Sequence, residues 1–249
     1  MWDNYIVTHE IIHGILISMV GRVDGNWILG KVIREPLKYD EQKIYKDHEV
    51  EMAIPISQDQ LNSARLFTSK YEYAKTLNKN IDYLEVGVGW GNSAKMFIDT
   101  TNANSADLLD FYNNSAGTRV PGGADPGIDA ESHEEYIKNK FSYHPNVNTI
   151  KGNMRKIFFE LNKKYDFILF DAETDRILIR NLLKHASTLI NPGGVIGFTS
   201  YLIHDSIHYD RHPGVYQAVN EFLSLNKNWY VDGIVLHDLG HHEIYIKKS

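Results

Sequence analysis

Residues 81–249 alternate between short apolar runs and longer amphipathic ones, and this pattern predicts an α/β fold. The short runs are rich in aliphatic and aromatic residues and predict strands at Tyr83–Val86, Asp107–Phe111, Val147–Ile150, Phe167–Phe170, Val195–Thr199, Tyr230–Leu236 and Glu243–Lys247. The longer runs repeat apolar residues at helical spacing and predict helices at Asn92–Asp99, Glu131–Phe141, Met154–Asn162, Arg176–Ile190 and Pro213–Leu225. Strands separated by helices in this way are typical of a mostly parallel sheet that is covered on both faces.

The end of the chain breaks this alternation. Only the stretch HDLGHH separates the strands predicted at Tyr230–Leu236 and Glu243–Lys247, and it is too short for a helix. We therefore expect these two strands to form an antiparallel hairpin at the edge of the sheet. Its turn, with His237, His241 and His242, should lie away from the edge where a ligand binds. We interpret these histidines as solvated turn residues rather than metal ligands.

The first 50 residues have a different character. The stretch GILISMVGRVDGNWILGKVI contains two β-rich runs around Asp24-Gly25-Asn26, and Asp-Gly between such runs predicts a hairpin. We expect residues 1–50 to form a β-rich cap or a dimerisation segment, and residues 51–249 to form the main domain. In SQDQLNSARLFTSKYEYAKTL, which follows, apolar residues at helical spacing predict a helix with Ser57 as its N-cap.

Composition narrows the classes of function. The chain has 249 residues, 43% of them hydrophobic, which suits one globular domain with an appendage. Its net charge of −6 provides no overall field that would recruit nucleic acid or an anionic membrane. It has no cysteine, which excludes disulfides and thiolate metal sites and fits a cytoplasmic protein. The N-terminal stretch lacks the basic region of a signal peptide, and its apolar run at Ile15–Val20 is too short to span a membrane.

Three glycines follow the strand predicted at Tyr83–Val86 and open the next helix. Gly87, Gly89 and Gly91 allow positive φ and let a ligand approach bare backbone, and ligands of open α/β sheets lie beyond the carboxyl ends of the strands. The dinucleotide fingerprint is G-x-G-x-x-G, but here the third glycine comes one residue early. An acidic residue, Glu85, also precedes the loop. The stretch therefore predicts a ligand-binding turn, with a tight structural turn as the alternative.

The pattern Glu-x-Gly-x-Gly-x-Gly resembles the first motif of class I S-adenosylmethionine-dependent methyltransferases. Compatible motifs follow in order, so that the resemblance covers about residues 50–249. It implies a Rossmann-like sheet in which Glu85 helps to hold the ammonium group of the methyl donor while main-chain N–H groups face the donor's carboxylate.

The resemblance also implies roles for residues at the ends of the later strands. Asp110 would accept hydrogen bonds from the ribose hydroxyls, Asn153 would accept one from the adenine amino group with Met154 against the ring, and Asp171 would lie beside the donor's methyl group. The complete set of implied cofactor contacts is Glu85, Gly87, Gly89, Gly91, Asn92, Ser93, Asp110, Phe111, Asn153, Met154 and Asp171.

Further stretches are similar to particular branches of this superfamily. EVGVGWGNSA, LLDFYNNSAG and HPGVYQAVNEF resemble motifs of macrocin O-methyltransferase-like enzymes, which act on sugars of natural products. FDAETDR followed by GGVIGF resembles, more distantly, the caffeoyl-coenzyme A and catechol O-methyltransferases. The resemblance implies O-methylation of a small hydroxylated acceptor, such as a sugar or an intermediate of natural-product biosynthesis.

Both branches typically hold a divalent cation with an aspartate after the fourth strand and an acidic pair after the fifth. Asp171 matches the aspartate, but Thr199-Ser200 stand where the pair is expected. Neutral hydroxyls do not replace a carboxylate for a hard cation. A metal site is therefore left open, with Asp175, Asp205 or a nearby histidine as substitute ligands.

Without a metal, a side chain must take the acceptor's proton. Asp171 is one candidate, and histidine titrates in the right range. Just past the fifth strand the chain supplies several histidines on the expected rim of the site, and His204 is favoured because it is nearest to the strand end. These histidines are His204, His208 and His212.

Residues 113–132 form a long segment that is rich in Gly, Pro and Asp. We interpret this segment as a lid over the acceptor pocket, with a tolerated insertion as the alternative.

The expected partner is a small-molecule acceptor, without nucleic acid or membrane, and homo-oligomerisation is left open. Two other functions remain as alternatives. One is a nicotinamide-dependent oxidoreductase, and the other is an inactive module that keeps the cofactor fold.

Overall fold

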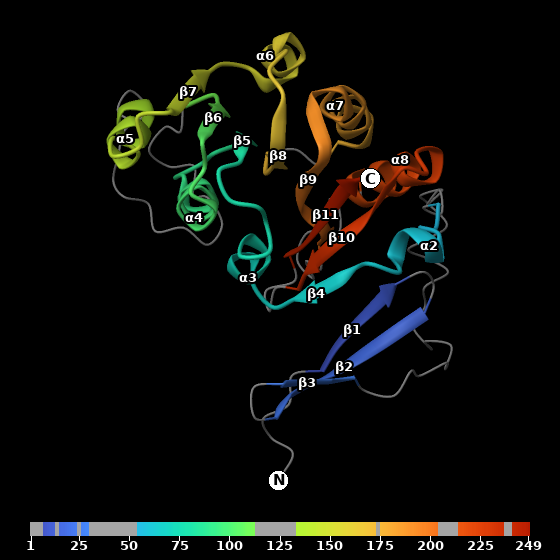
Figure 1. Ribbon diagram of the computed structural model, residues 1–249. Helices are drawn as coiled ribbons and strands as arrows, with labels where there is room; N and C mark the ends of the chain where they lie inside the picture. The colour runs from blue at the N-terminus through green and yellow to red at the C-terminus, as the bar shows by residue number, and fades with distance from the viewer. Residues whose placement is uncertain are drawn as a thin grey trace. The chain divides into compact units, whose positions relative to one another are not determined.

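The computed structural model divides the chain into two compact units, Met1–Pro55 and Ile56–Ser249. It describes residues 7–12, 15–23, 26–29, 54–112, 133–172, 175–203, 214–236 and 241–249. The first unit contains an antiparallel sheet in the order β1 (Val7–Ile12), β2 (Ile15–Val23), β3 (Asn26–Leu29) (Figure 1). Val23 pairs with Asn26, so the hairpin predicted around Asp24-Gly25 is confirmed.

The second unit is built on an eight-stranded sheet in the order β4-β10-β11-β9-β8-β5-β6-β7. Its strands are β4 (Arg65–Phe67), β5 (Asp82–Val86), β6 (Ser105–Asp110), β7 (Val147–Lys151), β8 (Tyr165–Phe170), β9 (Ile190–Ile203), β10 (Trp229–Val235) and β11 (His241–Lys248). Neighbours are parallel except on the two sides of β11, which is antiparallel to both β9 and β10. The Rossmann-like α/β fold and its antiparallel C-terminal hairpin are thus as predicted.

Helices cover both faces of this sheet (Figure 1). They are α2 (Gln58–Leu61), α3 (Lys70–Ala74), α4 (Asn92–Thr101), α5 (His133–Lys140), α6 (Met154–Glu160), α7 (Arg176–Leu189) and α8 (Gly214–Leu225). Helices α3, α4 and α5 lie on one face, and α6, α7 and α8 lie on the other (Figure 1). Every helix predicted after residue 81 is confirmed to within a few residues at its ends. None of the helices that the structure describes is long and apolar enough to cross a membrane.

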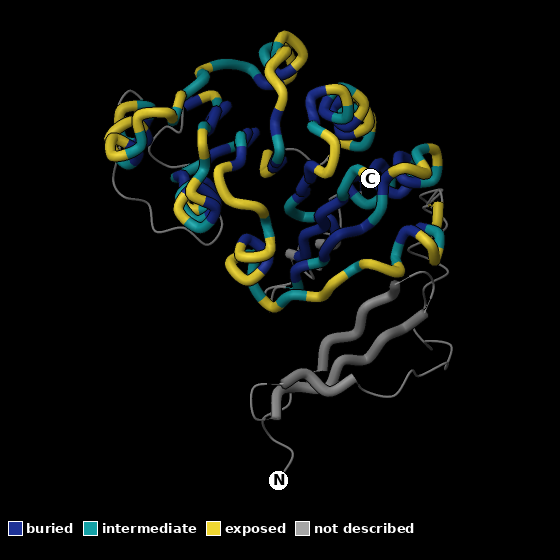
Figure 2. The backbone as a smooth tube through the Cα atoms, in the orientation of Figure 1, coloured by how far each residue is buried: buried dark blue, intermediate teal, exposed yellow. Residues whose placement is uncertain are grey.

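Alternation along β5 divides the core into two clusters. Leu84 and Val86 point into a cluster formed with α6, α7 and α8, while Tyr83 points into a cluster formed with α3, α4 and α5. Figure 2 shows the strands as the most deeply buried part of this unit, with exposed residues on the outer sides of the helices. Because residues two apart share a face of a strand, Glu85 lies on the same face as Tyr83, toward α3 and α4.

The helix predicted from Ser57 onward is wrong in its extent. The structure breaks it into α2 and α3 with β4 between them, because Arg65–Phe67 pairs in parallel with Gly233–Val235. Ser57 does occupy the N-cap position of α2, but its hydroxyl donates to Gln60 Oε1 (2.9 Å) instead of accepting a main-chain N–H. Helical spacing alone did not indicate that a distant strand would pair with the middle of this stretch.

The position predicted for the C-terminal hairpin is also wrong. The hairpin is not at the edge of the sheet, because β4 adds outside β10 and β11 inserts between β9 and β10. An antiparallel strand begins where its neighbour ends, so His241 pairs with Ile203 at the carboxyl end of β9. His242 is therefore buried at the edge where the glycine loop lies, not solvated away from it. Residues 237–240 of the turn lie outside the described residues.

Candidate functional site

The glycine loop joins β5 to α4 and depends on three left-handed backbone conformations. Gly87, Gly89 and Gly91 have φ of 89°, 50° and 69°, which residues with a side chain rarely adopt. A Cβ on Gly87 would lie 2.4 Å from Ala172 Cβ and 2.7 Å from the carbonyl oxygen of Asp171. A Cβ on Gly89 would meet no atom of the described residues within 4 Å. Gly87 thus lets the loop approach the end of β8, while Gly89 presents bare backbone to open space.

Asp110, at the end of β6, holds the main chain of this loop. Its Oδ2 accepts hydrogen bonds from the N–H groups of Val88 (2.7 Å) and Gly89 (2.9 Å), and its Oδ1 accepts one from Tyr112 (3.2 Å). Carboxylate oxygens have lone pairs for further donors, so this role is compatible with the predicted contact to ribose hydroxyls. Phe111, the aromatic residue predicted beside the cofactor, is 46% exposed.

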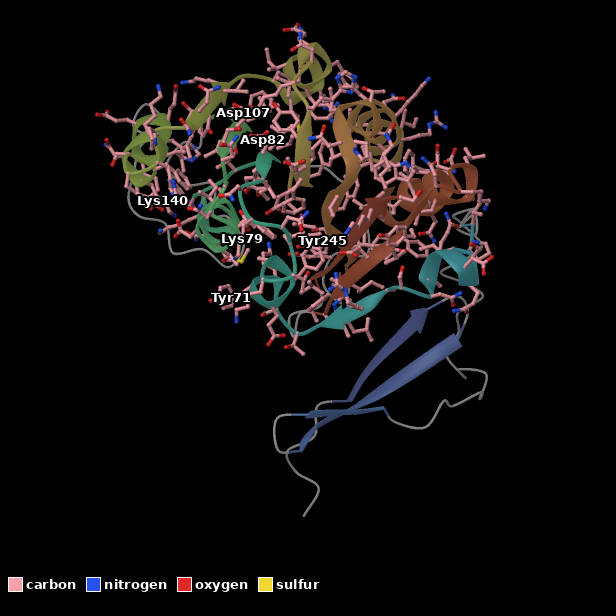
Figure 3. The ribbon with its side chains drawn as sticks, in the orientation of Figure 1. Tyr71, Lys79, Asp82, Asp107, Lys140 and Tyr245 are labelled. Atoms are coloured by element: carbon pink, nitrogen blue, oxygen red, sulfur yellow. The ribbon has the colours of Figure 1, made fainter. Side chains whose placement is uncertain are left out.

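Helix α5 holds the other side of the loop through two residues that the sequence analysis did not single out. The buried His133 donates from Nε2 to the carbonyl oxygen of Gly89 (2.9 Å), and its Nδ1 has no hydrogen-bond partner among the residues that the structure describes. Lys140 donates to the carbonyl oxygen of Trp90 (2.6 Å) and to Asn92 Oδ1 (2.7 Å), and Figure 3 shows it on α5 beside α4. No local sequence signal identified these contacts, which join segments more than 40 residues apart.

Glu85 lies on β5 just before the loop and is completely buried. The hydroxyl of Tyr83 donates to Oε2 of Glu85 (2.5 Å), but no described residue forms a hydrogen bond with Oε1. Burial raises the pKa of Glu85 to about 8, and the nearby charges of Asp171 and Asp110 add to this, while the hydrogen bond from Tyr83 and the charge of Lys70 oppose it. A buried carboxyl oxygen without a partner is costly, so a missing cationic or hydrogen-bonding partner is indicated at this position.

A largely buried ion pair interacts electrostatically with Glu85. Lys70 Nζ, on α3, lies 2.8 Å from Glu243 Oε1 on β11 and donates to Ser93 Oγ (3.0 Å) at the start of α4. The hydroxyl of Tyr245, labelled in Figure 3, donates to the other oxygen of Glu243. Burial would lower the pKa of Lys70, but the charges of Glu243 and Asp171 outweigh it and raise the pKa above its ordinary value. Lys70 is therefore a cation in the folded protein.

Asp171, the predicted methyl-donor contact and candidate base, is exposed at the end of β8. Its main-chain N–H donates to the carbonyl oxygen of Val86 (2.8 Å), which places it beside the glycine loop. Its Oδ1 accepts a hydrogen bond from the Thr199 hydroxyl (2.5 Å) on β9. Next to Thr199, Ser200 has a φ of 58° where the register between β9 and β11 shifts. Such irregular pairing is common beside functional sites.

The residues that were expected to bind a metal do not together provide the carboxylates that a divalent cation needs. Thr199 and Ser200 offer only hydroxyls, and Asp175 accepts the N–H of Leu178 (2.8 Å) as the N-cap of α7. Among the residues that the structure describes, no group of three His, Cys, Asp or Glu could hold a metal ion. Asp205 lies outside them. The described donors therefore do not fit a hard divalent cation.

The predicted adenine contacts follow β7. Asn153 is the N-cap of α6, and its Oδ1 accepts the N–H of Arg155 (2.9 Å). Asn153 was predicted to accept a hydrogen bond from the adenine amino group, but its side-chain oxygen already caps this helix. Met154, the first residue of α6, is 7% exposed and belongs to the core cluster on the side of the sheet that α6, α7 and α8 cover. The structure thus brings Glu85, the glycine loop, Asp110 and Asp171 to one edge, with Asn153 at the end of β7.

Several predicted features fall outside the described residues. These are the lid at residues 113–132 and, past β9, the residues His204, Asp205, His208 and His212. Within the described part of the chain, the site consists of a loop with bare backbone, an unpaired buried carboxyl oxygen, a partly buried ammonium and an exposed carboxylate. This arrangement can bind a polar molecule that carries both charges and can accept a proton at its outer end.

Comparisons with known proteins find one matching family model and several similar folds. Residues 84–206 match a family model described as a methyltransferase domain. A proposed rRNA methylase from Clostridium thermocellum has a similar fold, with a TM-score of 0.50 and 14% identity over 72% of this chain and 95% of that protein. A proposed methyltransferase from Streptococcus mutans in complex with SAH has a TM-score of 0.49 and 14% identity over 72% and 96% of the two chains. An O-methyltransferase family protein from Burkholderia thailandensis has a TM-score of 0.49 and 12% identity, over 72% of this chain and 54% of that one. A search of curated proteins finds no match.

Proposed function

We propose that this chain, which carries a methyltransferase domain at residues 84–206, transfers the methyl group of S-adenosylmethionine to a hydroxyl oxygen of a small acceptor. The observation that carries the choice of donor is the buried Oε1 of Glu85 at the base of the glycine loop, which has no hydrogen-bond partner in the described part of the chain. A nicotinamide dinucleotide presents a pyrophosphate to such a loop, and it has no ammonium group to place beside a buried carboxylate. The amino-acid end of S-adenosylmethionine offers an ammonium group.

The residues present fit this donor. Glu85 lies where it can pair with the ammonium, and Gly89 leaves open space in which a ligand can lie against the loop. Asp110 ends the neighbouring strand and has acceptor capacity left for the ribose hydroxyls. When bound, S-adenosylmethionine supplies an electrophilic methyl group on its sulfonium.

The protein's own part in the reaction is to position the acceptor and to remove its proton. The acceptor oxygen must lie in line with the methyl group at near-attack distance, and it must lose its proton as the new O–C bond forms. Asp171 is our first candidate for the base, because it is exposed at the carboxyl edge and Thr199 orients its Oδ1. His204, which follows β9, is the second candidate.

The acceptor class rests on sequence resemblance, and we propose a sugar or another hydroxylated intermediate. Residues 113–132, which join β6 to α5, are proposed to cover the acceptor. For the first unit we propose a role as a cap or in dimerisation. Methyl transfer is proposed to need no metal, since Thr199 and Ser200 provide no charge beside Asp171.

Calorimetric titration separates the donor hypotheses. We expect S-adenosylhomocysteine, the product of methyl transfer, to bind and NAD to give no heat of binding. Binding of NAD without binding of S-adenosylhomocysteine would overturn the proposal in favour of an oxidoreductase. A panel of sugars and phenols, assayed with S-adenosylmethionine for release of S-adenosylhomocysteine, then tests catalysis. Tight binding of S-adenosylhomocysteine without turnover on any class of acceptor would favour an inactive binding module.

A further inference from the structure

Lys70 occupies an unusual place for a lysine. It is the first residue of the short helix α3, yet its side chain is 20% exposed and reaches inward beside the glycine loop. Its ammonium contacts Glu243 (2.8 Å) and Ser93 (3.0 Å), and it lies near enough to Glu85 and Asp171 to be coupled to both charges. No motif assigned a role to Lys70.

The contacts of Lys70 leave part of its ammonium available. An ammonium has three N–H donors, and among the described residues Glu243 and Ser93 accept from two of them. Glu243 is 4% exposed in its side chain and is held by the hydroxyl of Tyr245. The ammonium is therefore held in place with one donor to spare.

Stability alone is a poor explanation for this ion pair. Burying both charges costs several kcal/mol per ion before their attraction is counted, and apolar residues of similar size often serve as well or better. Ser93 is the second residue of α4, so Lys70 also lies near the positive end of a helix dipole, which does not favour a cation. The ammonium and this helix end together favour an anion beside Ser93.

A second and independent observation completes the pattern. Oε1 of Glu85 is buried on the same face of the sheet without a partner among the described residues, and a cation or a donor would satisfy it. An available ammonium and an unpaired carboxyl thus lie on one face of the sheet and interact electrostatically. This pair is complementary to an α-amino acid, in which a carboxylate and an ammonium are both attached to the α-carbon.

We propose that Lys70 binds the α-carboxylate of the methyl donor, while Glu85 faces the donor's ammonium. The assignment rests on the proposed use of S-adenosylmethionine and adds a residue that selects for the intact amino-acid end. Glu243 and Tyr245 act as positioning residues, because they contact Lys70 or its partner and not the ligand.

The test pairs variants of Lys70 with ligands that differ only in the carboxylate. Calorimetry measures binding of S-adenosylhomocysteine and of S-adenosyl-3-thiopropylamine, which keeps the ammonium but lacks the carboxylate. We expect Lys70→Met to weaken binding of S-adenosylhomocysteine about 10- to 100-fold, because this is the range for loss of a hydrogen bond between charged groups. Binding of the thiopropylamine should change by less than about threefold, because this ligand has no carboxylate for Lys70 to bind. Lys75→Met, an exposed lysine at the end of the same helix, should change neither.

Lys70→Met leaves Glu243 buried without its counter-charge, so the double variant Lys70→Met/Glu243→Gln is measured beside it, with thermal melting as a check on folding. Equal losses for both ligands, or no loss for S-adenosylhomocysteine, would overturn the role of Lys70 and leave a structural ion pair. If the wild-type protein binds neither ligand, the proposed donor fails as well. These outcomes distinguish failure of the residue from failure of the function.

Discussion

The carboxylate of Asp110 accepts the main-chain N–H of Gly89 at 2.9 Å, so that the end of β6 holds the loop that follows β5. The same oxygen also accepts the N–H of Val88. A residue whose sequence position indicates contact with a ribose thus has an additional structural task, which is to keep the loop in its left-handed conformation. Loss of its carboxylate should affect both stability and binding.

For Asp110→Ala we expect the free energy of unfolding to fall by about 2 kcal/mol, since hydrogen bonds to a charged group are worth about 1.5–3 kcal/mol. Affinity for S-adenosylhomocysteine should fall at least about tenfold. Urea denaturation and calorimetry measure the two effects. Asp99→Ala, an exposed aspartate on α4, is the control and should leave ligand affinity unchanged. Unchanged affinity in Asp110→Ala would remove this residue from the site.

Gly87 and Gly89 should respond differently to substitution. Gly87→Ala places a Cβ 2.4 Å from Ala172 Cβ, so we expect it to destabilise the fold strongly. In Gly89→Asn the new side chain meets no protein atom near its Cβ, and Asn adopts left-handed conformations readily. It should therefore melt within a few degrees of the wild type yet lose S-adenosylhomocysteine binding. A Gly89→Asn variant that still binds this ligand tightly would show that the ligand does not lie against Gly89.

The buried carboxyl of Glu85 predicts a pH dependence of stability. Its pKa is about 8 in the folded protein, because burial disfavours the charged form, and the ordinary value is 4.5. The folded state keeps a proton that the unfolded chain loses, so this group's stabilising contribution is complete below pH 4.5 and is lost as the pH rises to 8. Relative to Glu85→Gln, the unfolding free energy of the wild type should fall by about 1.4 kcal/mol per pH unit in the middle of this window. Urea titrations at pH 5, 6, 7, 8 and 9 measure this difference, and parallel curves would contradict it.

Ligand binding should be linked to the same proton. An ammonium group beside Glu85 favours the ionised carboxylate, so binding of S-adenosylhomocysteine at pH 7 should release a proton, and affinity should rise toward pH 8. Calorimetry in two buffers with different ionisation enthalpies detects the release. Glu85→Gln should show neither the release nor the rise.

Asp171 is expected to affect turnover more than stability. With an acceptor identified by release of S-adenosylhomocysteine, Asp171→Ala should lower kcat about 100-fold or more, the usual contribution of a general base. Asp166→Asn, at the opposite end of the same strand, is the control and should keep its kcat. Full methyl transfer in Asp171→Ala would exclude Asp171 as the base and direct attention to His204.

Removal of metal ions tests the hydroxyls of Thr199 and Ser200. We expect turnover to be unchanged by EDTA and not to increase with added magnesium, because neither residue supplies a charged oxygen. Loss of turnover with EDTA, and its recovery with magnesium, would mean that residues beyond those described complete a metal site beside Asp171.

Local pattern was sufficient for most elements of the second unit. Alternating apolar runs predicted seven strands that the structure contains, and the three glycines after Tyr83–Val86 predicted a special backbone turn. These inferences depend only on period and turn chemistry, which neighbouring residues determine. The resemblance to class I methyltransferases implied in addition that Glu85, Asp110 and Asp171 would contact one ligand, and the structure brings them to one edge of the sheet.

The sequence by itself therefore determined the fold class, the glycine loop and the acidic residues at the strand ends. Only the tertiary structure decided that Lys70 and Glu243 form an ion pair. Glu243 reaches this position because β11 inserts between β9 and β10. Lys70 lies on α3, which was expected to be part of a longer helix. The contacts of His133 with the loop have the same origin. Charge pairs between distant segments leave no period in the sequence, since each side chain finds its partner only after the strands have paired and the helices have packed.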